Sequence, residues 1–233
     1  NVRIYIGADL KQPDEQIVSG NPADFLHRTF SALSLLYIEN PNAEPLPVTY
    51  GLPDDAFIRG KVPMTKSEIR SIVLSKLKLT KNAILFDIGA GTGSIAIEAA
   101  RQIPDGRVYA IERNPDGLDL IKENSLKLQA DNLTIVSGTA PECLDTLPAA
   151  THAFIGGSAG HLKEIMQLLY SRNPEIRIVI TAITLETISQ IMTLQKEMSL
   201  PEPEIVQLQV SSAKKAGPYH LMQGQNPVYI VSF

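Results

Sequence analysis

The chain has 233 residues, of which 44% are hydrophobic and 20% charged, and its formal net charge at pH 7 is −4. This balance is typical of a globular protein without a global basic field, so it argues against a nucleic-acid partner. The single cysteine, Cys143, excludes an internal disulfide and a cysteine-based metal centre, and it favours a reducing, cytoplasmic location. No apolar run approaches the roughly 18 residues of a membrane-spanning helix. We therefore expect no membrane partner and no bound metal.

The first 45 residues predict a small separate domain. Alternating apolar residues in "NVRIYIGADL" and the run "LLYIE" indicate two strands, and the spacing of "PADFLHRTFSAL" indicates a helix between them. The segment "NPNAEPLP", residues 40–47, contains three prolines and predicts a linker. Because the chain begins at Asn1 inside a strand-like pattern, we expect it to be a piece of a longer polypeptide.

Residues 46–233 predict an α/β domain. A helix should begin at Thr65, where "TKSE" matches a capping box between Thr65 and Glu68. Strands and helices then alternate, which predicts a doubly wound, mostly parallel sheet with helices on both faces. The last two strand-like runs, "EIVQLQV" and "NPVYIVSF", have no helix between them, so the final strand should be antiparallel. The expected strands are 83–88, 107–112, 133–137, 152–156 and 176–182, and the expected helices that follow the first are 93–102, 115–128, 141–145, 159–171 and 184–198.

The stretch "FDIGAGTGSIAIEAA", residues 86–100, places a glycine-rich loop between a strand and a helix. In a doubly wound sheet, ligands bind beyond the carboxyl ends of the strands, where this loop should lie. The pattern differs from a dinucleotide motif, because Ser94 stands where a third glycine is usual and Asp87 precedes the loop. A carboxylate repels a pyrophosphate but attracts a cationic amino-acid group. The loop therefore favours S-adenosylmethionine over NAD.

Glu112 ends the second strand of this domain, 21 residues after Gly91. A carboxylate at that point can accept hydrogen bonds from both ribose hydroxyls of the cofactor. The residues after the third strand should frame the adenine, although many methyltransferases carry an acidic residue at the position of Thr139. The expected cofactor residues are Thr65, Asp87, Gly89, Ala90, Gly91, Thr92, Gly93, Glu112, Arg113, Gly138, Thr139, Ala140 and Gly156.

Several segments together resemble one family: "GLPDDAFIRGKVPMTKSEIR", "DIGAGTGSIAIEAA", "VYAIERNP", "FIGGSAG", "TLET" and "AKKAGPYHLMQGQNPVYIVSF". They are similar to the CbiT-type methyltransferase domain of precorrin-6Y C5,15-methyltransferases (decarboxylating), which forms the C-terminal part of CobL. This likeness covers residues 46–233. Residues 1–45 resemble, through "DLKQPDEQI" and "LSLLYIEN", the C-terminal remnant of a CbiE-like tetrapyrrole methylase module followed by a linker.

The resemblance implies a class I S-adenosylmethionine-dependent methyltransferase fold, a Rossmann-like doubly wound sheet whose last strand is antiparallel. It implies methylation of C15 of a corrin precursor, and loss of carbon dioxide from the C12 acetate, in cobalamin biosynthesis. It also implies a homotetramer. Methylation of C5 is not expected, because the short CbiE-like remnant lacks the cofactor site of that module.

A corrin precursor carries many carboxylates, so its site needs positive side chains. Two basic clusters, one before the first helix of the domain and one between its last strands, should flank the site. The expected substrate residues are Arg59, Lys61, Met64, Gly157, Ser158, Thr181, Lys214 and Lys215. Tyr219 and His220 are candidate catalytic residues through substrate contact or proton transfer. Glu186 either joins them or caps a helix.

Two other functions are compatible with the sequence. The first is a class I methyltransferase that acts on RNA or protein, although RNA enzymes usually have a more basic surface. The second is a non-catalytic, cofactor-binding oligomerisation fragment. The sequence leaves open the cobalt content of the substrate and the order of methylation and decarboxylation.

Overall fold

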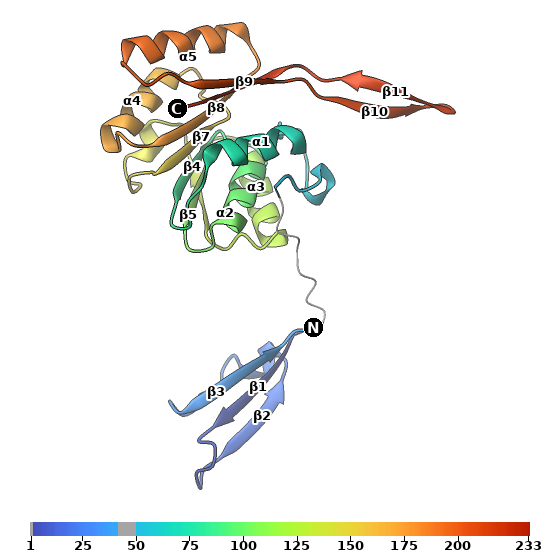
Figure 1. Cartoon of the computed structure of the whole chain (residues 1–233). Coiled ribbons are helices and arrows are strands. Elements are labelled where there is room, and N and C mark those ends of the chain that lie inside the picture. The colour runs from blue at the N-terminus through green and yellow to red at the C-terminus, as the bar shows by residue number, and fades with distance from the viewer. Residues whose placement is uncertain (1, 42–49) are drawn as a thin grey trace. The chain divides into compact units, whose positions relative to one another are not determined.

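The computed structural model describes residues 2–41 and 50–233 (Figure 1). The chain divides into two compact units, residues 1–47 and 48–233. The predicted linker at 40–47, with the predicted domain boundary inside it, lies largely outside the described residues. In the part of the chain that is described, no helix is both long enough and apolar enough to span a membrane.

The N-terminal unit is a three-stranded antiparallel sheet in the order β2-β1-β3. Its strands are β1 (Arg3–Ala8), β2 (Gln16–Gly20) and β3 (Ser34–Glu39). The predicted helix is wrong, because only a 3-10 turn forms at Pro22–Phe25. A helix is stabilised by burying an apolar face, yet Leu26 is 74% exposed, and Phe25 and Phe30 pack around Arg28 instead. The likeness of this unit to a tetrapyrrole methylase module stays a prediction.

The C-terminal unit is built on a seven-stranded sheet in the order β6-β5-β4-β7-β8-β12-β9. The first five strands in this order are parallel, and β12 is antiparallel to both of its neighbours. The prediction of a mostly parallel sheet with an antiparallel last strand is confirmed. The strands are β4 (Ile84–Ile88), β5 (Arg107–Glu112), β6 (Leu133–Ser137), β7 (His152–Ile155), β8 (Arg177–Ala182), β9 (Glu204–Leu208) and β12 (Val228–Ser232).

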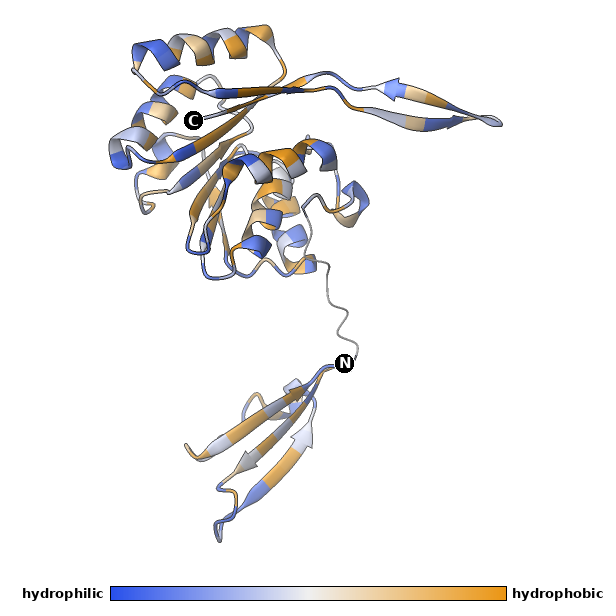
Figure 2. Ribbon diagram, viewed as in Figure 1, coloured by the Kyte–Doolittle hydropathy of each residue, from blue (hydrophilic) through white to orange (hydrophobic). Residues whose placement is uncertain are grey.

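Helices cover both faces of this sheet (Figure 1). The first three pack on one face, and the last two pack on the other, where they share a buried cluster with Phe86 and Ile88 of β4. Figure 2 shows hydrophobic residues along the strands between the two layers. A strand buried on both faces has few polar positions, which explains the near-continuous apolar runs in the sequence. The helices are α1 (Ser67–Leu77), α2 (Ser94–Gln102), α3 (Pro115–Lys127), α4 (Leu162–Arg172) and α5 (Leu185–Glu197).

Helix α1 begins later than expected, and the capping box predicted for Thr65 and Glu68 is wrong. The residue that precedes the helix provides no side-chain cap. Instead, Oδ1 of Asp54 accepts a hydrogen bond from the Ser67 amide at 3.0 Å. The Thr65 carbonyl accepts one from Nη1 of Arg70 at 2.6 Å. The start of α1 is therefore fixed by the segment before it rather than by a local motif.

Two other predicted helices differ from the structure. The one expected at 141–145 is only a 3-10 turn, Glu142–Leu144, because five residues are too few to gain from helix propagation. The one expected at 159–171 begins at Leu162. Ala159 and Gly160 have φ values of 52° and 92°, a left-handed conformation that a right-handed helix does not contain.

The residues between β9 and β12 contain a hairpin. Strand β10 (Ser211–Ala216) pairs antiparallel with β11 (Tyr219–Gly224), and every residue of both strands is exposed. The hairpin extends from β9 and β12 away from the rest of the unit (Figure 1). It includes two large apolar side chains, Leu221 and Met222, which are 60% and 68% exposed.

Candidate functional site

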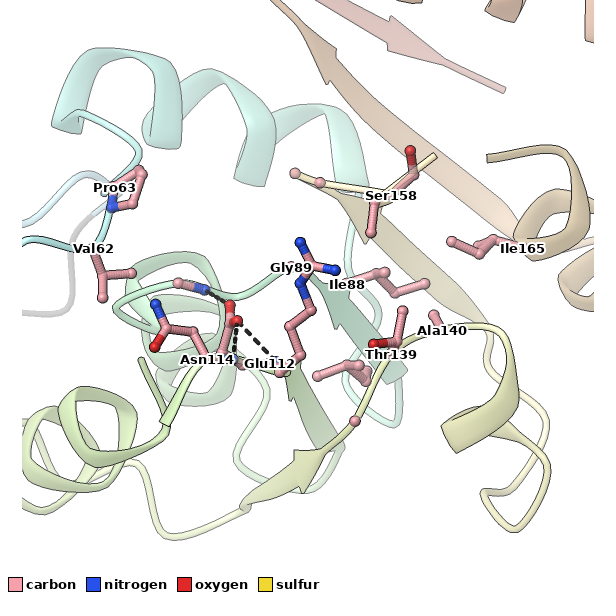
Figure 3. Close-up of a pocket in the computed structure, with 17 residues that line it drawn as sticks. Val62, Pro63, Ile88, Gly89, Glu112, Asn114, Thr139, Ala140, Ser158 and Ile165 are labelled. Carbon is pink, nitrogen blue, oxygen red and sulfur yellow. Dashed lines mark hydrogen bonds between the residues drawn. The ribbon is translucent and has the colours of Figure 1, made fainter. Parts of the chain in front are cut away.

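A cavity of about 360 Å³ lies at the carboxyl ends of β4, β5, β6 and β7 (Figure 3). The loops that follow four neighbouring parallel strands meet there, because such strands end at the same edge of a sheet. Ten residues predicted for the site line this cavity: Gly89, Gly91, Glu112, Arg113, Gly138, Thr139, Ala140, Gly156, Gly157 and Ser158. The structure thus brings together the glycine loop, the acidic strand end and the predicted adenine frame.

Glu112 is anchored by three backbone amides (Figure 3). Its Oε2 accepts a hydrogen bond from Gly91, and its Oε1 accepts from Arg113 and Asn114, each at 2.8 Å. A carboxylate has about four acceptor positions, so three are occupied. The fourth, on Oε2, can accept one ribose hydroxyl without rearrangement. A second hydroxyl must share Oε1 with the two amides.

Gly91 lies directly against the cover segment, which we define as residues 50–66. Its φ is 58°, and a Cβ atom there would come within 2.7 Å of the Pro63 carbonyl oxygen. Both the left-handed backbone and the close contact require glycine. Val62 and Pro63 complete the cavity on this side. The cover segment therefore forms one wall of the cavity.

Gly117 of α3 supports Glu112 from behind, a role that the sequence analysis missed. A Cβ atom at Gly117 would lie 2.8 Å from Cγ of Glu112 and 3.1 Å from the Gly91 carbonyl oxygen. Gly117 is in the first turn of α3, where glycine is still a less favourable helix residue than alanine, so its presence points to a packing constraint. A glycine within a predicted helix was the sequence signal that could have identified this role.

Asp87 lies beneath the glycine loop rather than in the cavity. Its carboxyl group is fully buried, and Oδ2 accepts a hydrogen bond from the Ala96 amide at 2.9 Å. Burial raises the pKa of Asp87 to about 7, because desolvation disfavours the charged form. In the described chain, Oδ1 of Asp87 and the Thr92 hydroxyl have no hydrogen-bond partner. Attraction of a cationic cofactor tail by Asp87 stays a prediction.

Several other predicted residues do not line the cavity. Ala90, Thr92 and Gly93 belong to the glycine loop, and Thr65 belongs to the cover segment. Arg59 and Lys61 are exposed and Met64 is half-buried. Lys214 and Lys215 lie on β10, and Tyr219 and His220 on β11, all exposed on the projecting hairpin. Glu186 is exposed in a groove between α4 and α5, and Thr184 rather than Glu186 caps α5. The substrate and catalytic roles of these residues stay predictions.

A second cavity, of about 220 Å³, adjoins the first and shares Gly156, Gly157 and Ser158 with it. It is bounded by the ends of β7 and β8 and the starts of α4 and α5, and it includes Thr181. Its lining combines hydroxyl and aliphatic side chains. Among the described residues that line it, none is charged.

The residues of the larger cavity fit S-adenosylmethionine. Gly89 and Gly91 line the cavity without side chains, and Glu112 offers an acceptor where a ribose can reach it. A seven-stranded sheet with this strand order, a glycine loop after its first strand and an acidic residue after its second define the class I S-adenosylmethionine-dependent methyltransferases.

The chain belongs to the family of the precorrin methyltransferase domain, whose family model matches residues 55–233. It is 40% identical over 187 residues to a probable cobalt-precorrin-6B C(15)-methyltransferase (decarboxylating) of Pyrobaculum calidifontis, covering 79% of this chain and 95% of the relative. It is 39% identical over 181 residues to the cobalt-precorrin-6B C(15)-methyltransferase (decarboxylating) of Salmonella typhimurium, covering 77% and 93%. A solved precorrin-6y C5,15-methyltransferase of Geobacter metallireducens GS-15 is 39% identical, with a TM-score of 0.75, covering 80% and 98%.

Proposed function

We propose that this protein methylates C15 of a precorrin, with S-adenosylmethionine as the donor, and removes one carboxyl group as carbon dioxide. The observation that carries the proposal is the joining of two cavities with different linings. One has a glycine loop and a ribose acceptor, and the other has no charged lining residue in the described chain. The names of relatives that are 39–40% identical support this choice of substrate.

In this proposal the residues of the chain orient the reactants. S-adenosylmethionine, when bound, supplies an electrophilic methyl group. Glu112 and the glycine loop hold the ribose and the amino-acid part of the donor, and Val62 and Pro63 exclude water from one side. Gly156 and Gly157, which lie between the two cavities, have no side chains to separate donor and acceptor. Such positioning is the main requirement for methyl transfer to carbon.

The smaller cavity is suited to the carboxyl group that leaves. A carboxylate that the bound macrocycle covers in this cavity loses hydration and gains no ion pair from the lining, which raises its ground-state free energy. When the bond to the carboxyl carbon breaks, carbon dioxide departs and the bonding electrons enter the conjugated macrocycle. The methylene carbon that is left takes up a proton. The lack of a charged side chain among the described lining residues favours this loss, because the hydroxyl groups of Ser158 and Thr181 offer hydrogen bonds but no ion pair.

The test is to incubate the chain with a corrin precursor and methyl-labelled S-adenosylmethionine, and to analyse the products by mass spectrometry. We expect gain of one methyl group and loss of one carbon dioxide. Ile183→Lys places an ammonium at the rim of the smaller cavity, where Ile183 is 63% exposed. An ion pair there should lower carbon dioxide release about two- to fivefold relative to methyl transfer.

The matched control is Leu185→Lys, which adds the same charge two residues away at a site 74% exposed and outside the smaller cavity. It should leave the ratio of the two reactions unchanged. An equal effect of both variants would contradict the proposed role of the smaller cavity. Transfer of label to total RNA or to protein instead of the precorrin would contradict the substrate. Cofactor binding without any turnover would support a non-catalytic fragment.

We also propose a homotetramer that works in the cytoplasm and that assembles through the β10–β11 hairpin. The exposed Leu221 and Met222 support an interface there, because a two-stranded hairpin is marginally stable without further packing. Lys214 and Lys215 of one copy could then approach the cavity of another. Light scattering should give four times the 25.4 kDa of one chain, and Leu221→Lys should lower that mass. A monomeric mass for the unaltered protein would contradict this arrangement.

A further inference from the structure

The walls of the larger cavity are joined by a buried side chain that touches neither cavity. The cover segment supplies Val62 and Pro63 on one side, and the glycine loop supplies Gly89 and Gly91 on the other. Both segments are irregular, so their spacing is not set by sheet pairing. Besides the direct contact between Gly91 and Pro63, it depends on side chains that bind both segments.

Asn124 of α3 makes this connection. Its Oδ1 accepts a hydrogen bond from the Ile58 amide at 2.6 Å, and its Nδ2 donates to the Ile58 carbonyl at 3.0 Å and to the Thr92 carbonyl at 3.2 Å. The side chain is fully buried. A carboxamide is the one neutral group that can bind both the amide and the carbonyl of one residue and still donate to a second carbonyl.

The two residues that Asn124 holds lead directly to the site. Thr92 follows Gly91, whose amide donates to Glu112. Ile58 precedes Val62 by four positions in the cover segment. Through its hydrogen bonds to Ile58 and Thr92, Asn124 therefore holds the glycine loop and the cover segment at a fixed distance from each other.

Helix α3 supports the site at three successive positions of one face. Gly117 lies against Glu112, Ile121 lies 3.0 Å from the position of a Cβ atom on Gly93, and Asn124 binds Thr92. These three residues are the buried residues of α3. They are separated by four and three positions along the chain, which places them on one face of the helix. The buried face of α3 is thus a platform for the cofactor loop.

We propose that Asn124 is a positioning residue that holds the cofactor cavity at its binding width before the ligand arrives. A preformed site avoids the cost of ordering two loops on binding. Without the carboxamide, the Ile58 and Thr92 groups lose their partner, and the cover segment can move away from the glycine loop. Cofactor affinity then falls although no residue that lines the cavity has changed.

The alternative is that Asn124 stabilises the fold without affecting the site, and Asn132 provides the matched control. Nδ2 of Asn132 donates to the carbonyls of Ala100, Ile103 and Gly106 at 3.1, 2.8 and 3.3 Å. Asn132 precedes β6, at the end of the sheet opposite the cavity. Both asparagines bind several backbone groups far from them along the chain, but only Asn124 joins the walls of the cavity.

The experiment compares Asn124→Ala, Asn124→Asp and Asn132→Ala in the full chain. Titration calorimetry with S-adenosylhomocysteine measures affinity, and thermal unfolding measures stability. Both alanine variants should unfold at lower temperature, but only the Asn124 variants should raise the Kd, by about tenfold or more. Asn124→Asp keeps the acceptor for Ile58 and loses both donated bonds, so it tests the same idea without removing side-chain volume.

Hydrogen exchange provides a measurement that does not depend on ligand binding. Amides of residues 58–66 and 91–93 should exchange faster in the Asn124 variants and at the original rate in Asn132→Ala. A Kd within about twofold of the original for folded Asn124→Ala or Asn124→Asp would overturn the proposal, as would an equal rise for Asn132→Ala. Because only cofactor binding is measured, the result does not depend on which substrate the protein methylates.

Discussion

Replacing Arg70 by methionine is expected to lower the free energy of unfolding of the C-terminal unit by about 3–5 kcal/mol, the range for breaking a buried ion pair. Arg70 is fully buried and Glu98 is 2% exposed. The Arg70 guanidinium contacts Glu98, Asp54 and the carbonyls of Leu52 and Thr65. Without it, the Glu98 carboxylate would stay buried with no cationic partner.

The same cluster holds the start of the cover segment. Glu98 of α2 accepts hydrogen bonds from the amides of Gly51 and Leu52 at 2.7 and 2.9 Å. The Arg70 guanidinium also lies 4.8 Å from the centre of the Phe57 ring, a distance typical of a cation–π contact. Loss of Arg70 should therefore loosen the segment that forms one wall of the cofactor cavity.

The measurement is urea unfolding followed by the helical signal in circular dichroism, which reports the C-terminal unit because all five α-helices lie there. Combining Arg70→Met with Glu98→Gln should recover part of the loss, because the neutral amide removes the buried charge and its one oxygen keeps one of the two hydrogen bonds from Gly51 and Leu52. Lys81→Met breaks an exposed pair with Asp105 and should cost about 1 kcal/mol or less. A similarly small loss for Arg70→Met would contradict the prediction.

Glu112→Ala is expected to weaken S-adenosylhomocysteine binding about ten- to a hundredfold. A hydrogen bond between a charged group and a hydroxyl contributes about 1.5–3 kcal/mol, which corresponds to that range of affinity. The variant also frees the Gly91 amide that Glu112 binds at 2.8 Å. Titration calorimetry measures the change, and Asp119→Ala, at an exposed position of the neighbouring α3, is the control that should leave the Kd unchanged.

A double-mutant cycle separates contact with the ribose from support of the loop. Analogues that lack the 2′ or the 3′ hydroxyl should bind the unaltered protein more weakly but should bind Glu112→Ala about as well as the complete ligand does. Because one acceptor position on Oε2 is free, one of the two hydroxyls should show most of the coupling. If removal of a hydroxyl group lowers the affinity equally for the unaltered protein and for Glu112→Ala, Glu112 does not contact the ribose.

Much of the C-terminal unit could be predicted because its signals are local. Strands buried on both faces read as apolar runs, and the helices between them carry apolar residues at helical spacing. The positions of β5 and β6 match the prediction at both ends, and β4 begins one residue late. The glycine loop and Glu112 were found because each follows a recognisable strand, and parallel strands end at one edge of the sheet.

The predictions failed where a local pattern lacked a tertiary partner or had a different one. The apolar spacing around Phe25 predicted a helix that does not form, since Leu26 has nothing to pack against in the described part of its unit. The predicted capping box at Thr65 does not form. Instead, Asp54, 13 positions before Ser67, accepts a hydrogen bond from the Ser67 amide at the start of α1. Tyr219 and His220 lie on an exposed hairpin outside the cavity, and their catalytic roles stay predictions.

The sequence by itself determined most of the alternation of strands and helices from β4 to α5, the antiparallel last strand and the cofactor loop. These depend on periodicity and on residues that are close neighbours along the chain. The class of enzyme followed from the resemblance of several segments to one family. Only the tertiary structure decided how the cavity is held in shape. Arg70 and Glu98 are 28 positions apart, and Asn124 and Ile58 are 66 apart. A buried polar side chain must find its partner wherever folding brings one, and no local pattern encodes a partner at that separation.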